Sequence, residues 1–455
     1  MKKGQIIEGT VIRADYPDTG IVLADGREVR IRDAIPGQTV RARVDKCRHG
    51  KVGARLLGVL QKADCEVEPD CPHFAVCGGC SFRQMTYEDQ LAMKEDQIRR
   101  LLAPYCGEGV FEGILASPEP TEYRNKMEFT FGDAVKGGPM TLGMHERGSF
   151  YDVVTADECR IIHGDMRQIL SCVLALAAES GLDFYHRMSH EGYFRHLLLR
   201  RSHSSGDVMA ALVTTTQADE ERAGDLDREL VAALTELPLE GRLRGVLHIW
   251  NDSPADIVTA DRIEVLYGED RLEEEILGLH FEISPFSFFQ TNTAGAEVLY
   301  RRVREYAGSQ HRREIFDLYS GTGTIAQILS GTADHVTGVE IVPEAVEAAR
   351  ENARRNQLTH CRFLCGDVLQ VVDELREKPD LIVLDPPRDG IHPKAIGKII
   401  GFDVPGMIYI SCKATSLVRD LEILTAAGYE VRRASACDLF PGTPHVETVV
   451  LLSRV

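Results

Sequence analysis

The sequence predicts a multidomain α/β protein that ends in a doubly wound parallel sheet. Its 455 residues correspond to about three domains, at roughly 100 to 200 residues per domain. Short alternating segments near the start are typical of a small antiparallel barrel. After residue 281, apolar strands and helices alternate regularly, which indicates parallel strands with helices on both faces.

Residues 1–62 are expected to form the barrel. Runs such as IIEGTVIRA and REVRIRD alternate polar and apolar residues, and Asp25-Gly26 and Pro36-Gly37 mark turns. This segment holds 13 Lys and Arg against 7 Asp and Glu, a net charge of +6, whereas residues 63–455 hold 39 against 63, a net charge of −24. The segment resembles the TRAM domain, an OB-like RNA-binding module, and its charge favours RNA. A purely structural barrel is the alternative.

Residues 63–280 are expected to form a central α+β domain. Strand-like runs such as NKMEFTFGD and FRHLLLRRS accompany a helical stretch at 165–181, and Asp219 to Arg228 reads as a solvated helix. The spacing of residues 86–103 indicates an amphipathic helix, which we expect to pack on the C-terminal domain.

Four cysteines of this domain have a spacing typical of metal ligands. Cys71, Cys77 and Cys80 form a C-x5-C-x2-C pattern beside two glycines, and Cys159 follows a strand-rich interval. Closely spaced thiolates with a distant fourth ligand can hold one iron–sulfur cluster. Zinc and burial without metal are the alternatives. Cys65 lies six residues before Cys71, and we interpret it as a bystander.

Residues 281–455 are expected to form the domain with the parallel sheet. The run DLYSGTGT at 317–324 joins a strand to a helix, so that its glycines bring backbone close to a ligand. Glu340 ends the next strand, where a carboxylate can bind ribose hydroxyls, and Asp367 ends the third, within reach of an adenine amino group. This spacing resembles class I S-adenosylmethionine-dependent methyltransferases. A dehydrogenase or an unliganded Rossmann-like domain is the alternative.

Cys412 closes the apolar run GMIYISC at the end of a predicted parallel strand. Such a position opens into the ligand crevice of a doubly wound sheet, where a nucleophile would lie. A small buried hydrophobe is the alternative. The DPPR turn at 385–388 follows another apolar strand, and its prolines fix polar groups over the same crevice.

Five ordered motifs together resemble the RNA uracil-5-methyltransferase family: CPHFAVCGGC (71–80), SPFSFFQTN (284–292), DPPR (385–388), the strand-ending SC (411–412) and HVET (445–448). The resemblance implies a Rossmann-like class I methyltransferase domain, S-adenosyl-L-methionine as methyl donor and a [4Fe-4S] cluster on the four cysteines. It implies that S-adenosylmethionine contacts Gln290, Tyr319, Glu340 and Asp385, with Asp367 and Thr324 as further candidates. Cluster-bearing members modify 23S ribosomal RNA, which is therefore the expected substrate. The uridine of the tRNA T-loop is the alternative.

The resemblance also implies Cys412 as nucleophile and Glu447 as general base. Carbon 5 of uracil is too weak a nucleophile to attack a sulfonium methyl group directly, so a thiolate must first add to carbon 6. A base must later remove the proton from carbon 5. The family commonly continues as SCNP, whereas here Lys413 and Ala414 follow the cysteine. This departure supports the alternative of a non-catalytic RNA-binding iron–sulfur assembly factor.

The remaining expectations concern location and partners. No segment approaches the roughly 18 uncharged apolar residues of a membrane span, and the start MKKGQIIEGT lacks an apolar signal core. We expect a cytoplasmic monomer with reduced thiols and an RNA partner. Basic residues near the central strands are candidate RNA contacts: Arg124, Lys126, Arg195, Arg200 and Arg201.

Overall fold

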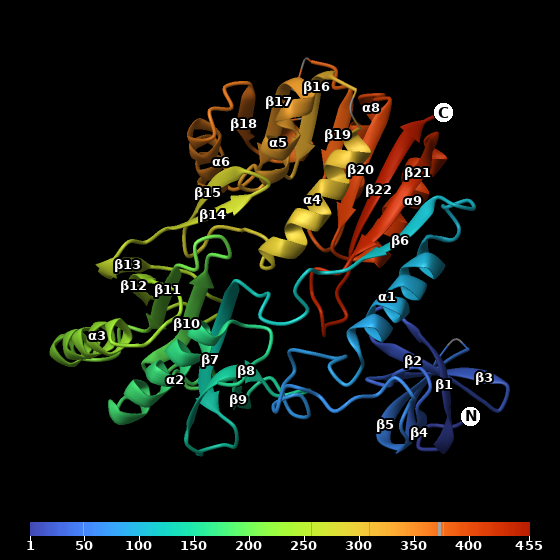
Figure 1. The fold of residues 1–455 in the computed structure, drawn as a ribbon. Coiled ribbons are helices and arrows are strands. Elements are labelled where there is room, and N and C mark those ends of the chain that lie inside the picture. Colours follow the sequence, from blue (N-terminus) through green and yellow to red (C-terminus); the bar gives the residue numbers. More distant parts are fainter. Residues whose placement is uncertain (49, 256, 309, 372–374, 376) are drawn as a thin grey trace.

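The computed structural model describes residues 1–48, 50–255, 257–308, 310–371, 375 and 377–455. Figure 1 shows an N-terminal barrel, a central sheet and a C-terminal sheet flanked by helices. No helix among the described residues is long and apolar enough to cross a membrane. The predicted multidomain α/β architecture is confirmed.

The first strands close into a barrel in the order β1-β2-β3-β5-β4. Antiparallel pairing of β1 with β4 closes it, and Val11, Val29 and Val40 lie in its core. The alternating pattern produces this core, because successive side chains of a strand point to opposite faces. The predicted N-terminal barrel is confirmed. Its strands are β1 (Ile6–Asp15), β2 (Thr19–Ala24), β3 (Arg27–Arg32), β4 (Thr39–Arg48) and β5 (Lys51–Gln61).

Two elements after the barrel belong to the C-terminal sheet. α1 (Tyr87–Leu102) begins after Thr86, whose hydroxyl accepts the Asp89 N–H, and its Ile98 lies in the core below that sheet. β6 (Phe111–Leu115) pairs in parallel with β21 (Tyr429–Cys437) at the sheet edge. α1 and β6 therefore belong to the C-terminal sheet, although they lie within residues 63–280, which the sequence analysis assigned to the central domain.

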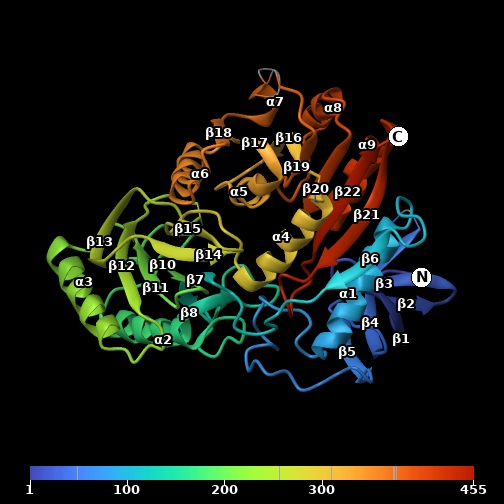
Figure 2. The same cartoon turned by 45° about the horizontal axis from the view of Figure 1, so that its top comes forward.

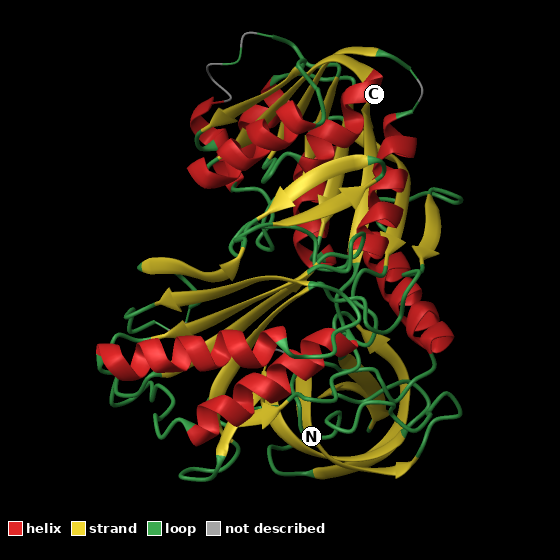
Figure 3. Cartoon of the chain, turned by 60° about the vertical axis from the view of Figure 1, so that its left-hand side comes forward, coloured by secondary structure: helices red, strands yellow, loops and turns green. Residues whose placement is uncertain are grey.

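The central sheet has the order β13-β12-β11-β10-β7-β8-β9. Figure 3 shows its two helices side by side on one face, where they bury Ile169 and Leu230. The charge-rich stretch from Asp219 begins the second of these helices, and the Asp219 carboxylate accepts the Arg222 N–H. The elements are β7 (Lys126–Asp133), β8 (Met140–His145), β9 (Val153–Thr155), α2 (Gly164–Glu179), β10 (Phe194–Arg201), β11 (Val208–Thr214), α3 (Glu220–Thr235), β12 (Leu243–Trp250) and β13 (Arg262–Gly268).

The C-terminal sheet has the order β18-β17-β16-β19-β20-β22-β21-β6. Strands β16 to β20 pair in parallel, and β22 pairs antiparallel with both of its neighbours. The elements leading to and forming this region are β14 (Leu272–Ile276), β15 (Leu279–Ile283), α4 (Thr293–Ala307), β16 (Arg312–Leu318), α5 (Thr324–Leu329), the short helix η1 (Ser330–Thr332), β17 (Ala333–Glu340), α6 (Pro343–Arg355), β18 (Cys361–Cys365), α7 (Val368–Val371), β19 (Leu381–Leu384), α8 (Pro393–Gly401), β20 (Gly406–Ser411), α9 (Ala414–Ala426), β21 and β22 (Glu447–Arg454).

Helices cover both faces of this sheet. α4, α5 and α6 pack on one face, while α1, α8 and α9 pack on the other, as Figure 2 shows from above. The strand order reverses between β16 and β19, so the loops after these two strands diverge to opposite faces. In doubly wound sheets, ligands bind in the crevice at such a switch point.

Candidate active site

A cavity of about 2070 Å³ lies at the carboxyl ends of the parallel strands and extends to the cysteine segment. It is larger than the roughly 300 to 1,000 Å³ of a small-molecule pocket, and so has room for a cofactor and a flipped base. The predicted site residues all line it, namely Cys71, Cys77, Cys80, Cys159, Gln290, Tyr319, Thr324, Glu340, Asp367, Asp385, Cys412 and Glu447.

The glycine loop has the backbone that a close ligand approach requires. Tyr319 has a left-handed φ of 71°, and Gly323 has a φ of 76° at the start of α5. A Cβ on Gly323 would lie 2.6 Å from the Phe363 ring, so no other residue fits there. The Glu340 carboxylate accepts a hydrogen bond from the Gly321 N–H at 3.0 Å. This bond joins the end of β17 to the loop that follows β16. The loop therefore presents backbone and a carboxylate to one corner of the cavity.

Buried carboxyls make this part of the cavity acidic. Burial raises the pKa of Asp317 to about 8, with a further contribution from Asp385, and it raises the pKa of Asp385 itself to about 7. Asp317 accepts the Ala326 N–H at 2.9 Å from the first turn of α5. A cationic ligand beside these carboxyls would favour their ionised forms and lower both pKa values.

Gln290 lies on a loop that the central sheet holds in place. Arg200 is 3% exposed and donates to the backbone carbonyls of Pro285, at 3.0 Å, and of Ser287. Asn125 donates to the Gln290 carbonyl at 2.9 Å, and both Gln290 and buried Tyr300 line the cavity. The central sheet thus positions one wall of the cavity.

Cys412 and Glu447 lie on adjacent strands. β20 and β22 pair antiparallel with Ser411 opposite Thr448, so the next residues, Cys412 and Glu447, continue the register at the mouth of the crevice. Glu447 is only 4% exposed, although it stands at the start of a strand. The pair is therefore enclosed in the cavity.

The pKa values of this pair reflect burial and mutual charge. Burial raises the pKa of the Cys412 thiol to about 11, and Glu447 and Asp385 add to the increase. Burial and Asp385 raise the pKa of Glu447 to about 8. The Arg388 guanidinium opposes both shifts. Without ligands, the site holds a neutral thiol.

Arg388 and His445 form a polar pair in the same cavity as Cys412. Their nearest nitrogens lie 3.0 Å apart, and burial followed by the Arg388 charge lowers the pKa of His445 to about 4. His445 is therefore neutral and accepts from the arginine. Lys413 instead lies 3.9 Å from the Asp389 carboxylate. The sequence identified the DPPR turn, but not Asp317 or the partnership with His445.

The four cysteines of the predicted metal site are free thiols that converge on the same cavity. Burial and the neighbouring Cys159 raise the pKa of the Cys80 thiol to about 12. Arg147 donates to the Cys80 carbonyl at 2.6 Å, and the Gly79 N–H faces the Cys77 sulfur at 3.4 Å. Within the described part of the chain, no group of three or more His, Cys, Asp or Glu side chains has the spacing that could hold a metal ion.

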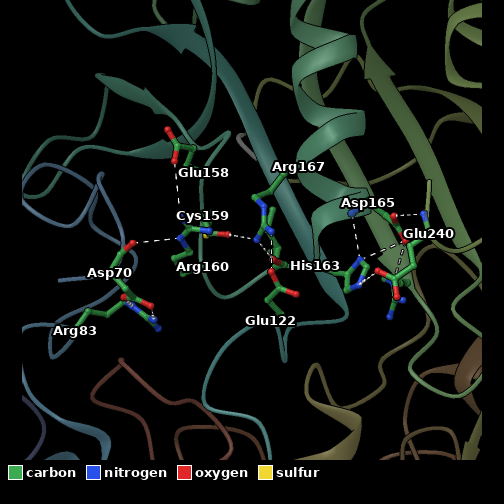
Figure 4. A network of polar contacts seen from close by, with 12 residues as sticks. Asp70, Arg83, Glu122, Glu158, Cys159, Arg160, His163, Asp165, Arg167 and Glu240 are labelled. Atoms are coloured by element: carbon green, nitrogen blue, oxygen red, sulfur yellow. Dashed lines mark hydrogen bonds and ion pairs between the residues drawn. The ribbon is translucent and has the colours of Figure 1, made fainter. Parts of the chain in front are cut away.

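Arginines also fix the backbone that carries Cys159. In Figure 4, Arg167 extends from α2 to the Cys159 carbonyl, 3.1 Å away, and to the Glu122 carboxylate at 2.7 Å. Cys65 packs instead with the small cluster around Phe82, and its sulfur faces the Pro36 carbonyl at 4.0 Å. This placement agrees with the interpretation of Cys65 as a bystander.

Two of the basic residues proposed as RNA contacts are buried. Arg195 is 3% exposed and donates to the Asn251 carbonyl at 2.6 Å. Arg200 donates to the Pro285 and Ser287 carbonyls. The prediction that these two side chains contact RNA is wrong, because their charges face backbone carbonyls inside the protein. The alternating pattern of their strand gave no sign that both faces are covered.

Comparisons with known proteins agree with this geometry. Residues 261–455 match the model of a family described as tRNA (uracil-5-)-methyltransferase. An uncharacterized RNA methyltransferase of Clostridium acetobutylicum is 46% identical over 100% of this chain and 99% of its own length. An uncharacterized RNA methyltransferase of Caldanaerobacter subterraneus subsp. tengcongensis is 43% identical, with 100% of both chains covered.

One solved structure is similar over nearly the whole molecule. The tRNA (uracil-54, C5)-methyltransferase of Pyrococcus abyssi, in complex with S-adenosyl-L-homocysteine, superposes with a TM-score of 0.76 at 23% identity, covering 98% of this chain and 100% of that one. At this identity the similarity establishes the fold. Together with the full-length relatives and the family model, it shows that the chain is an RNA methyltransferase and belongs to the RNA uracil-5-methyltransferase family.

Proposed function

We propose that this enzyme transfers a methyl group from S-adenosylmethionine to carbon 5 of a uridine in RNA, through a covalent bond between Cys412 and carbon 6. The observation that carries the proposal is the register of β20 and β22, which sets Cys412 and Glu447 side by side in one cavity. This pair can serve two neighbouring carbons of one ring as nucleophile and base.

The Cys412 sulfur forms a bond to carbon 6, and the π electrons of the carbon 5–carbon 6 bond move towards oxygen 4. Carbon 5 thereby becomes nucleophilic enough to accept a methyl group. S-adenosylmethionine, when bound, would supply that methyl group from its positively charged sulfur, and would leave as the neutral thioether S-adenosylhomocysteine. Glu447 then takes the proton from carbon 5, the double bond re-forms, and the Cys412 thiolate leaves.

The residues around the crevice fit a cationic cofactor. Tyr319, Thr324 and Glu340 surround the glycine loop, and Asp367 follows the third strand of the sheet. Asp385 and Asp317 supply negative charge, whose cost of burial a cationic ligand would offset. Gln290 closes the opposite wall. We assign cofactor binding to the residues predicted from the sequence and add Asp317.

Arg388 supports the chemistry electrostatically. Its positive charge favours the thiolate of Cys412 and the carboxylate of Glu447, since it lowers the pKa of both groups. His445 holds the guanidinium without competing for charge, because it remains neutral. An arginine held in this way can also donate to a uracil carbonyl or a phosphate.

We propose that Cys71, Cys77, Cys80 and Cys159 hold a [4Fe-4S] cluster. Four free thiols line one enclosed volume, and their backbone is held by Arg147 and Arg167. A single zinc ion would need sulfurs about 3.8 Å apart, given a Zn–S bond of about 2.3 Å. A cluster of several irons accommodates thiolates that are further apart than this.

The preferred substrate is 23S ribosomal RNA. The cluster-type cysteine pattern and the basic barrel support this choice, and the barrel presents exposed Arg43, Lys46 and Arg55 to a polyanion. A uridine of tRNA is the second candidate, favoured by the description of the matching family and by the activity named for the Pyrococcus abyssi structure.

Covalent trapping tests the reaction. RNA containing 5-fluorouridine should form a complex with the enzyme and S-adenosylmethionine that survives denaturing electrophoresis, because fluorine cannot leave as a proton. Cys412→Ala should form none, and Glu447→Gln should form the adduct with natural uridine but release it slowly. A wild-type enzyme that forms no adduct would favour the non-catalytic assembly factor.

Competition between RNA substrates tests the target. Matched 23S ribosomal RNA fragments and tRNA transcripts, both lacking modification, should be offered with labelled methyl donor. Label in the ribosomal RNA alone supports the proposal, whereas label in tRNA alone replaces it with the second candidate.

A further inference from the structure

The turn that carries Arg388 is held by α9, the helix that begins two residues after Cys412. Residues three and four apart share one face of a helix. On one face of its N-terminal half, α9 carries three polar side chains, Ser416, Arg419 and Asp420. All three make hydrogen bonds to the backbone of residues 388–391, which end the DPPR turn and form the loop after it.

Ser416 provides the direct contact with the Arg388 backbone. Its hydroxyl donates to the Arg388 carbonyl at 2.7 Å, and the serine is only 7% exposed. A hydrogen bond shielded from water is electrostatically stronger than one at the surface. Ser416 lies four residues after Cys412, in the first turn of the helix. It therefore links the residue that bears the guanidinium to the helix that starts beside the nucleophile.

Asp420 joins the same loop to the strand that leads into the nucleophile. Its side chain is completely buried, and one carboxylate oxygen accepts the Ile391 N–H at 2.8 Å and the Tyr409 hydroxyl at 2.6 Å. Tyr409 belongs to β20, three residues before Cys412. The other oxygen accepts two N–H groups of Arg419 at 2.7 and 2.9 Å. One buried carboxylate thus fixes a strand, a loop and a helix relative to one another.

The loop approaches this carboxylate closely because residue 390 is glycine. Gly390 has a left-handed φ of 76°, and a Cβ there would lie 2.5 Å from the Asp420 carboxylate and 2.6 Å from the Arg419 guanidinium. No larger residue fits. The Arg419 guanidinium also donates to the Asp389 carbonyl at 2.7 Å. The residues on both sides of Gly390 are therefore fixed to α9.

An ion pair also spans the loop, but it lies in solvent. The Lys413 ammonium is 3.9 Å from the Asp389 carboxylate, and that aspartate side chain is 98% exposed. Exposed pairs of this kind contribute little, because water and salt screen them. The buried hydrogen bonds from α9, rather than the charge of Lys413, therefore hold the turn.

We propose that Ser416 and Asp420 are positioning residues that keep Arg388 at a fixed place relative to Cys412 in the cavity. The inference rests on the proposed function, in which Cys412 adds to the uridine and Arg388 supports it. The Arg388 side chain is exposed and long, so it loses much conformational freedom when it is held in one place. Fixing its backbone to the helix beside the nucleophile removes part of that freedom before RNA binds.

A double-mutant cycle isolates the role of Ser416. Ser416→Ala removes the hydroxyl that holds the turn, and Arg388→Gln removes the guanidinium. We expect Ser416→Ala to slow formation of the Cys412 adduct with 5-fluorouridine RNA about fivefold, a typical loss for one hydrogen bond. In the Arg388→Gln background, the same serine substitution should change this rate less than about twofold, because the group that it positions is gone. Ser416→Thr restores a hydroxyl and should recover most of the rate.

Alkylation of Cys412 by iodoacetamide, measured without RNA, follows the same cycle independently of catalysis. Arg388 favours the thiolate of Cys412, so Ser416→Ala should slow alkylation about twofold in the wild-type background and not in Arg388→Gln. A loss of stability alone would act equally in both backgrounds.

Tyr409→Phe tests Asp420 in the same way. It removes the hydroxyl that the carboxylate accepts and keeps the buried ring. We expect adduct formation to slow about two- to fivefold, and again only while Arg388 is present. Thr425→Ala is the matched control, since it removes a hydroxyl of α9 that donates to the Leu421 carbonyl at 2.7 Å, at the end of the helix remote from Cys412. It should keep the wild-type rates of adduct formation and alkylation.

Two results would overturn the proposal. One is an unchanged adduct rate for Ser416→Ala. The other is an equal loss in the wild-type and Arg388→Gln backgrounds, which would show that the serine only stabilises the fold. Failure of the underlying chemistry gives a different result, because the wild-type enzyme would then form no adduct with 5-fluorouridine RNA. In that case the alkylation rates still report whether Ser416 positions Arg388 relative to the thiol.

Discussion

Lys94 donates a hydrogen bond to Asp438 across 2.7 Å, and both side chains are completely buried. The lysine also donates to the Phe440 carbonyl at 3.3 Å. This ion pair joins α1 to the loop that leads from β21 to His445 and Glu447. The amide N–H groups of Ser81 and Phe82, next to Cys80, donate to Gly442 in the same loop at 2.8 and 2.9 Å. The loop that leads to Glu447 is therefore held from two directions.

Replacing Lys94 by methionine should destabilise the protein by about 3 kcal/mol, because it leaves the Asp438 carboxylate buried without its cation. Urea unfolding monitored by circular dichroism measures the loss. Arg301→Gln is the control: it breaks an exposed pair with Glu297 on α4, and should change the free energy of unfolding by less than about 0.5 kcal/mol. If both variants lowered the free energy of unfolding equally, the buried Lys94–Asp438 pair would be no more important for stability than the exposed Arg301–Glu297 pair.

The free energy of unfolding of the ligand-free protein should fall as pH rises from about 5 to about 8. Burial raises the pKa of Asp385 to about 7 and of Glu447 to about 8, so the folded state binds their protons more tightly than the unfolded chain does. This contribution is complete below the unfolded values of about 4 and is lost as pH passes the folded values. In the Glu447→Gln variant, the free energy of unfolding should fall over this pH range by about 1 kcal/mol less than in the wild type, or by a still smaller amount. Identical pH curves for the variant and the wild type would refute the assignment.

S-adenosylmethionine should lower the pKa of the Cys412 thiol more than S-adenosylhomocysteine does. Asp385 is among the charges that raise this pKa, and a sulfonium beside it would offset its field, whereas a neutral thioether would not. The pH dependence of iodoacetamide alkylation, followed by mass spectrometry of the Cys412 peptide, reports the difference. If both compounds at saturation gave the same pH profile of Cys412 alkylation, this coupling between the cofactor and the thiol would be ruled out.

Anaerobically purified protein should contain about four irons per chain and absorb visible light. Cys80→Ser should lose most of the iron, while Cys65→Ser, whose thiol packs in a different cluster, should keep it. Iron removal should also lower the unfolding temperature, since the cysteine segment holds the Gly442 loop. Elemental analysis that finds zinc and no iron would exclude the cluster.

The sequence was sufficient where local pattern determines structure. Alternation predicted the N-terminal barrel, and apolar strands with intervening helices predicted the parallel sheet that gathers Tyr319, Glu340 and Asp385 at one edge. These features follow from spacing along the chain, which is visible in the residues themselves.

The sequence was insufficient where a partner lies far away in the chain. The place of β6 depends on β21, and Glu112 and Ser435, which contact each other there, are 323 residues apart. The burial of Arg195 and Arg200 depends on loops that fold over them. The packing of Tyr16 against the C-terminal core joins two regions whose docking no local pattern encodes.

The pairing of β6 with β21 also constrains the order in which the molecule can be completed during synthesis. The ribosome makes β6 first, then the whole central sheet, and only much later the strand that β6 must join. At about 5 to 20 residues per second, the 323 residues between Glu112 and Ser435 correspond to a wait of about 16 to 65 seconds. By the end of that interval the barrel and the central sheet have all of their own strands, whereas β6 has had no β21 to pair with. The C-terminal sheet is therefore finished after the barrel and the central sheet, and Cys412 and Glu447 can come together only when β22 has left the ribosome.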